Sequence, residues 1–219
     1  MVHNGLPTLE RLGVPATMFV CPGLIETDVS FWWRLADWAM EHLPEQSAIY
    51  APSGDLTEYV KAVTDGRRRE IIKTLLDKVE RPFPPSWRQL SDDDLAAWTG
   101  AGMALGNHSW DHPCLDQCAP DAQREQIRRT HEWLCDHLGH RPRSFAYPNG
   151  NFSDVFDREV ADLRYELGLL YDNKLADLNG PPLQMSRVML EADQPAKRLV
   201  GVLSGAQPAM RAVTTRLGR

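Results

Sequence analysis

Short apolar segments alternate with longer amphipathic segments through most of this 219-residue chain. The apolar segments are rich in strand-favouring residues and are bounded by glycine, proline or polar residues, so each is predicted to be a buried strand. The expected strands are residues 16–20, 102–105, 143–147, 167–171 and 185–190. Strands separated by helices are joined by crossover connections that place them parallel in one sheet. The alternation therefore predicts an α/β fold with a parallel sheet.

Capping residues and helical spacing predict where the helices lie. Glycine is expected to end two helices, after Leu12 and after Leu138, and serine is expected to cap three, at Ser30, Ser91 and Ser153. The expected helices are residues 7–12, 31–42, 55–63, 67–79, a short helix after residue 91, and residues 120–138, 154–163 and 195–203.

Residues 21–90 differ from the rest of the chain because nearly all of them have a helical pattern. A chain of this length can bury one sizeable core, so one domain over residues 1–219 is the default expectation. We therefore expect a single domain in which a helical insertion, at about residues 24–90, separates two strands of the sheet.

Composition narrows the functional class. The net charge is −6, so the chain lacks the basic excess that binds nucleic acid or anionic membranes. No apolar run is long enough to span a bilayer, and residues 1–5 lack the pattern of a signal peptide. We therefore expect a cytoplasmic protein with no membrane-spanning segment, in which the four cysteines are reduced.

Two histidines, His108 and His112, follow directly after the strand expected at residues 102–105. Their spacing of four would place both imidazoles on the same side of a helical turn. Neutral imidazole is a common zinc ligand, and strand ends are where α/β proteins place their sites. A metal site needs further ligands, so two alternatives stay open: surface histidines on a polar turn, and a zinc cluster that adds Cys114 and Cys118.

Four segments, in the same order along the chain, resemble motifs of one known family. The segment Gly102-Met-Ala-Leu-Gly-Asn-His-Ser-Trp-Asp-His-Pro113 is the most specific of them. The others are residues 6–20, 145–150 and 185–188, and the Phe-Trp-Trp segment that begins at Phe31 is similar to a helical insertion of one branch. On these residues the chain resembles the polysaccharide deacetylases of the NodB-homology type, carbohydrate esterase family 4.

The resemblance implies a distorted (β/α) barrel with fewer than eight strands. It also implies a metal-dependent hydrolase that removes acetyl groups from a carbohydrate substrate. His108 and His112 would be ligands of a divalent ion, expected to be zinc. Tyr147 would line the site, with nearby backbone available to the oxyanion, and Asn149 and Arg187 would lie near the pocket.

The chain departs from the family pattern in two places. The family motif Thr-Phe-Asp-Asp-Gly ends a first strand and supplies the aspartate base and the aspartate metal ligand, and it has no counterpart here. No histidine follows His140, so the late acid of many members has no candidate either. We therefore expect a chain truncated before the Asp-Asp motif, which lacks the first barrel strand and has no identified catalytic residue. Asp111 and Asp116 are considered as substitute ligands.

Three functional hypotheses remain open from the sequence. The first is a metal-dependent carbohydrate deacetylase, or a truncated copy of one. The second is a non-catalytic glycan-binding remnant. The third is a zinc-stabilised structural module built on His108, His112, Cys114 and Cys118.

Overall fold

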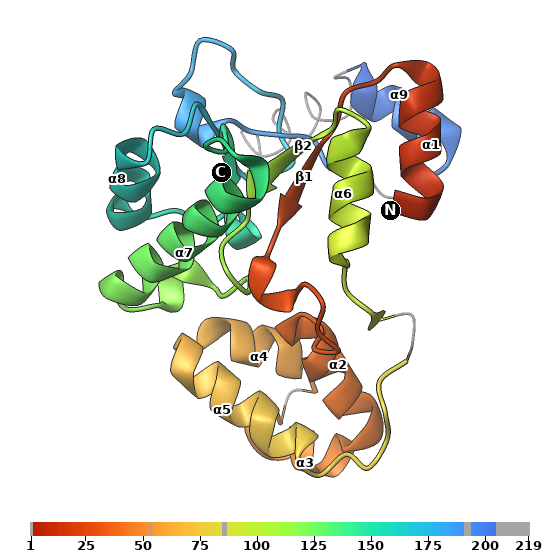
Figure 1. The fold of residues 1–219 in the computed structure, drawn as a ribbon. Coiled ribbons are helices and arrows are strands. Elements are labelled where there is room, and N and C mark those ends of the chain that lie inside the picture. The colour runs from red at the N-terminus through yellow and green to blue at the C-terminus, as the bar shows by residue number, and fades with distance from the viewer. Residues whose placement is uncertain (1, 53, 85–86, 191–193, 205–219) are drawn as a thin grey trace.

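Four short parallel strands form the sheet at the centre of the molecule (Figure 1). The computed structural model describes residues 2–52, 54–84, 87–190 and 194–204. The strands are β1 (Thr17–Val20), β2 (Ala104–Asn107), β3 (Ser144–Ala146) and β4 (Leu167–Leu169), and they lie in the order β1-β2-β3-β4. All three pairings are parallel, as predicted. In the described part of the chain the sheet stays open, because β1 pairs with β2 alone.

Helices connect the strands and cover the sheet. Figure 1 shows α7 (Pro120–Leu138) and α8 (Asp154–Asp162) on one side, and α1 (Val2–Leu12), α6 (Asp92–Gly100) and α9 (Ala196–Leu203) on the other. Between them lie two apolar cores. One joins α1, α6 and α7 to β1 and β2, and the other joins α7 and α8 to β3. The expected α/β fold of alternating strands and helices is confirmed.

Local sequence signals set the ends of these helices. Pro120 opens α7, and Gly139 ends it with a φ of 69°, a left-handed conformation that suits glycine. Ser91 and Asp94 form a capping box at the start of α6, and the Ser153 side chain accepts from Phe156 N at the start of α8. These predicted helix ends are confirmed.

Four helices between β1 and β2 form a unit with its own apolar core, below the sheet in Figure 1. They are α2 (Trp32–His42), α3 (Pro44–Tyr50), α4 (Leu56–Ala62) and α5 (Asp65–Leu76), and we call this unit the helical insertion. The insertion was predicted, but α3 was not, and α5 ends three residues before the predicted residue 79. The predicted cap at Ser30 is wrong: Phe31 occupies the cap position, and the buried Ser30 hydroxyl has no partner among the described residues.

The strand expected at residues 185–190 is also wrong, apart from one bridge between Leu169 and Met185. One amide that a ladder would use is taken by a side chain, since Met189 N donates to Asn173 Oδ1 at 3.1 Å. The Ser186 hydroxyl also donates to Asp172, at 2.7 Å. The segment therefore lies beside β4 without extending the sheet.

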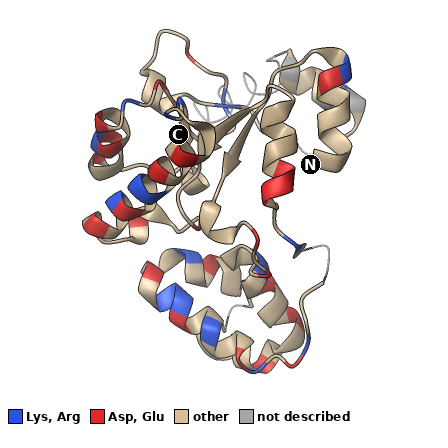
Figure 2. Cartoon of the chain, viewed as in Figure 1, with Lys and Arg blue, Asp and Glu red and all other residues tan. Residues whose placement is uncertain are grey.

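The structure also shows how charge is distributed along the helices and whether the cysteines are paired. Figure 2 shows Lys and Arg interspersed with Asp and Glu along α5 and α7. All four cysteines are free thiols, as expected. No helix within the described ranges has both the length and the apolar character needed to cross a membrane.

The capping box at α6 gives a direct test of the fold. Replacing Ser91 with Ala removes the acceptor of the Asp94 amide, so the free energy of unfolding should fall by about 1 kcal/mol. Ser91→Thr keeps the hydroxyl and should retain most of that stability. Urea unfolding followed by circular dichroism measures both variants, and equal losses in the two would contradict the capping role.

Candidate metal centre

The two predicted histidines lie at the carboxyl end of the sheet. His108 follows the last residue of β2, and its amide donates to Val20 O at the end of β1, at 3.1 Å. The imidazole rings of His108 and His112 meet edge to face, with centroids 4.7 Å apart and planes at 85°. The structure therefore brings the pair together where parallel-sheet proteins place their sites.

The loop between the histidines is not helical, so the expectation of one helical turn is wrong. Ser109 and His112 have φ values of 65° and 59°, in the left-handed region. Side chains accept the amides that a helix would pair with its own carbonyls: Asn107 Oδ1 accepts from Ser109 N at 2.9 Å, and Ser109 Oγ accepts from His112 N at 3.2 Å. Gln126 Oε1 accepts from the two amides between them, at 2.9 and 3.2 Å.

Asn107 anchors this loop from inside the protein. Its side chain is fully buried, and Nδ2 donates to Ile127 O at 3.0 Å and to the Tyr165 hydroxyl at 2.7 Å. These two hydrogen bonds fix the end of β2 against α7 and against the segment before β4.

His108 is held in the tautomer that a metal ligand requires. Its Nδ1 lies 2.7 Å from Ala146 O, and since a carbonyl oxygen can only accept, Nδ1 carries the proton. Nε2 is left with a free lone pair. Burial lowers the pKa of His108 to about 4, with a smaller lowering from the Arg187 charge. The ring is therefore neutral at physiological pH.

His112 is neutral, and one of its ring nitrogens is buried without a hydrogen bond in the described part of the chain. Burial and, to a smaller extent, the neighbouring His108 lower its pKa to about 3. Its Nδ1 is buried and has no hydrogen-bond partner among the described residues. A buried nitrogen without a partner is unfavourable in the free protein, and a bound cation would satisfy it. Two facing neutral imidazoles fit part of the ligand set of a zinc site.

Aromatic residues of the helical insertion pack against His112. The rings of Phe31 and Trp33 lie edge to face with its imidazole, at centroid distances of 5.6 and 4.6 Å. Trp32 Nε1 donates to the His112 carbonyl at 3.0 Å. No pattern in the sequence indicates that these aromatics pack on the histidine site.

The other three predicted site residues, Arg187, Asn149 and Tyr147, each have different surroundings. Arg187 lies near His108, because its guanidinium is 5.9 Å from the centre of the Phe19 ring, which is itself 6.4 Å from the His108 ring. Asn149 donates from Nδ2 to Cys114 Sγ at 3.3 Å. The fully buried Tyr147 donates from its hydroxyl to Asp157 at 3.0 Å, so its phenol is directed toward α8, and its amide already donates to Leu169 O.

The alternative ligands do not join the histidines. No three His, Cys, Asp or Glu side chains are placed to share an ion in the part of the chain that the structure describes. Burial raises the pKa of the Cys114 and Cys118 thiols, which keeps both protonated. The Asp111 carboxylate is bound by Arg69, and the Asp116 carboxylate accepts from Gln117. The four-residue His–Cys cluster is therefore not assembled.

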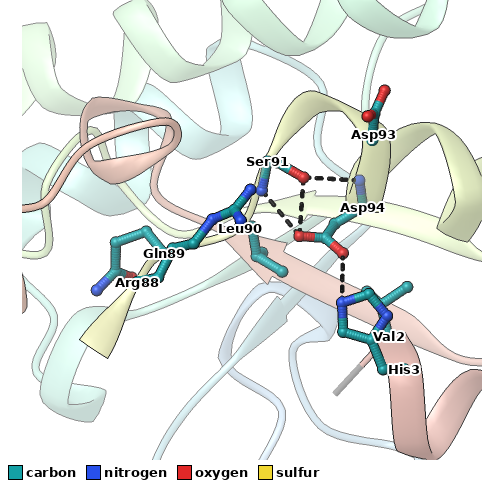
Figure 3. A pocket seen from close by; sticks show the side chains of 8 residues that line it. All are labelled: Val2, His3, Arg88, Gln89, Leu90, Ser91, Asp93 and Asp94. Atoms are coloured by element: carbon teal, nitrogen blue, oxygen red, sulfur yellow. Dashed lines mark hydrogen bonds and ion pairs between the residues drawn. The ribbon is translucent and has the colours of Figure 1, made fainter. Parts of the chain in front are cut away.

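One cavity borders the histidine loop, and a second lies apart from it. One of about 390 Å³ lies between the insertion and the histidine loop, and its walls include Trp32, Arg69 and Pro113. A separate cavity of about 510 Å³ is formed by α1 and the start of α6 (Figure 3). There, Asp94 is bound by Ser91 and lies 3.4 Å from His3. None of the eight residues that line this second cavity belongs to the histidine loop, so it is not part of the candidate centre.

Fold and site together define an α/β protein with a pair of neutral histidines at the carboxyl end of a parallel sheet. A family model described as polysaccharide deacetylase matches residues 1–168. The chain belongs to this family.

Solved structures of deacetylases share the fold. The Streptococcus pyogenes deacetylase PplD is 18% identical, with 92% of this chain and 84% of that chain covered and a TM-score of 0.50. IcaB from Ammonifex degensii is 15% identical, with 88% and 63% covered and a TM-score of 0.53. A de-N-acetylase from Aggregatibacter actinomycetemcomitans is 10% identical, with 92% and 70% covered and a TM-score of 0.55. At these identities the likeness concerns the fold.

One curated relative also matches. The uncharacterised protein YlxY of Bacillus subtilis is 35% identical over 51 residues, which is 23% of this chain and 16% of the relative's length. The match therefore spans a small part of that protein.

The lowered histidine pKa values predict a pH-dependent stability once metal is removed. As pH falls below 6.5, both histidines become protonated in the unfolded chain. In the folded protein they stay neutral until about pH 4 for His108 and about pH 3 for His112. Stability is therefore complete above pH 6.5 and is lost toward pH 4, by up to about 1.4 kcal/mol per pH unit for each histidine.

Urea unfolding of the chelator-treated protein between pH 7 and pH 4 measures this slope. His112→Gln removes one of the two groups and should reduce the slope by about half. Parallel curves for the wild type and the variant would show that His112 does not resist protonation.

Proposed function

We propose that this protein is a metal-dependent hydrolase that removes acetyl groups from an N-acetylated carbohydrate, with His108 and His112 as ligands of a divalent ion, zinc by expectation. The observation that carries the proposal is the buried Nδ1 of His112, which has no partner among the described residues and belongs to an imidazole that faces a second neutral imidazole. Membership of the polysaccharide deacetylase family supports the substrate class and the C–N bond.

The residues of the chain prepare this centre before any ion binds. The bond from His108 Nδ1 to Ala146 O orients the ring and leaves Nε2 free. The aromatic contacts of Phe31 and Trp33 exclude water from one side of His112. When bound, a divalent ion supplies polarisation of the acetyl carbonyl and activation of water. Four-coordination needs further ligands, and in the described part of the chain none is in place.

Arg187 supplies a positive charge on the same side of the sheet as His108. Its Nε donates to Leu170 O at 2.9 Å, which holds the side chain while the rest of the guanidinium remains available. A fixed positive charge favours the acetyl oxygen as that oxygen becomes negative. We propose Arg187 and Asn149 as substrate-binding residues. Tyr147, whose amide and hydroxyl are already bonded within the protein, would support the wall of the site. The catalytic base and acid are not identified.

A second function is favoured by one observation. No carboxylate joins the histidine pair among the described residues, so in this second function the chain binds a glycan without hydrolysing it.

We also propose that residues 1–219 form one domain in which about residues 24–90 are the insertion. Limited proteolysis would test this, because cleavage of a single domain should release no fragment that stays folded on its own.

Acetate release from N-acetylated chito-oligosaccharides, with and without added zinc, tests the proposed reaction. His108→Ala should lower zinc-dependent release by at least about 100-fold, because a metal centre supplies several kcal/mol of transition-state stabilisation. His140→Ala, which replaces an exposed histidine outside the site, is the matched control. Retained oligosaccharide binding without any acetate release would favour the binding function instead.

A further inference from the structure

Asp111 lies inside the histidine loop and connects it to the helical insertion. Arg69 of α5 binds its carboxylate with two hydrogen bonds, Nη1 to Oδ2 at 2.8 Å and Nη2 to Oδ1 at 2.9 Å. Gln126 of α7 donates to the same carboxylate, Nε2 to Oδ1, at 2.9 Å. Three elements that are far apart in the sequence therefore meet at one residue, directly before His112.

Both partners of Asp111 are themselves held in place. Asp65, one turn before Arg69 on α5, accepts from Arg69 Nε at 2.7 Å and also binds Arg68. Gln126 uses its other end to accept the amides of Trp110 and Asp111. The carboxylate is thus received by groups whose orientation is already fixed, which reduces the entropy lost when the bonds form.

The backbone on each side of Asp111 needs such support. Ser109 and His112 are both in the left-handed conformation, which is unfavourable for residues with a Cβ and persists only where surrounding contacts impose it. The contacts that impose it include those from Asn107, from Gln126 and, through Asp111, from Arg69. Without the Arg69 contact, one of these supports is lost.

The solvent exposure of Arg69 and Asp111 indicates that their ion pair positions the loop more than it stabilises the fold. The Arg69 side chain is 50% exposed and the Asp111 side chain 21% exposed. Ion pairs this accessible contribute little to the overall free energy of unfolding. The two hydrogen bonds from Arg69 still determine where Asp111 lies in the loop. Loss of these bonds should therefore disturb the histidine pair far more than the stability of the fold.

We propose that Arg69 and Asp111 are positioning residues, which clamp the histidine loop to the helical insertion and hold the two imidazoles at the separation that one cation requires. This rests on the proposed metal function of His108 and His112. It also gives the insertion a second role besides covering His112, since α5 contacts the loop that carries both ligands.

Cobalt(II) titration of the full chain, followed by visible absorption, tests the clamp. Arg69→Ala and Asp111→Asn should each weaken cobalt binding about tenfold, as the loss of residues that orient ligands does elsewhere. The double variant should be no weaker than either single variant, because both remove the same contact. Arg69→Lys, which forms one bond in place of two, should fall between. Arg67→Ala removes a neighbouring arginine that pairs with Glu70 instead of Asp111 and should leave affinity unchanged.

Hydrogen exchange of the metal-free protein separates this proposal from the metal function. Peptides covering residues 108–113 should exchange faster in Arg69→Ala than in the wild type, while the melting temperature changes by less than about 3 °C. If the wild type binds no cobalt, the proposed function fails, and exchange alone decides whether the clamp exists. Unchanged exchange in Arg69→Ala, or additive losses of cobalt affinity in the double variant, would overturn the clamp.

Discussion

The buried side-chain amide of Asn107 is the interaction on which the histidine site depends. It satisfies the carbonyl of Ile127 and the hydroxyl of Tyr165 with Nδ2, and accepts the amide of Ser109 with Oδ1. Leaving such buried groups without partners costs about 1–3 kcal/mol each. The chain is therefore forced to turn at Ser109 as soon as β2 ends, and this turn brings His112 back to face His108.

Local signals in the sequence predicted the frame of the fold well. Pro120 and Gly139 set both ends of α7, and the Ser91 capping box set the start of α6, because each depends on residues within one helical turn. Predictions failed where distant side chains replaced local pairing. The loop from His108 to His112 is not helical because Asn107 and Gln126 accept its amides. Residues 185–190 form only a bridge, and the amide of Met189 is taken by the side chain of Asn173.

The candidate site was only partly predictable for the same reason. The resemblance to a known motif pointed to His108 and His112, and the structure brings these two rings together. Their surroundings depend on contacts between residues far apart in the sequence, such as Trp32 with His112, 80 positions apart, and Arg69 with Asp111, 42 positions apart. No periodicity or spacing reports such contacts. The helical insertion, expected only as an interruption of the sheet, supplies the aromatic wall of the site and a tie to its loop.

A crystal structure of the zinc-loaded protein, with the ion located by anomalous scattering at the zinc edge, tests the central claim most directly. The account predicts one anomalous peak between the two imidazoles, about 2.0–2.1 Å from a nitrogen of His108 and of His112, with Asp111 still bound to Arg69. A zinc ion held by the thiols of Cys114 and Cys118, or by Asp111 in place of Arg69, would contradict it. So would the two imidazoles turned away from a common ion.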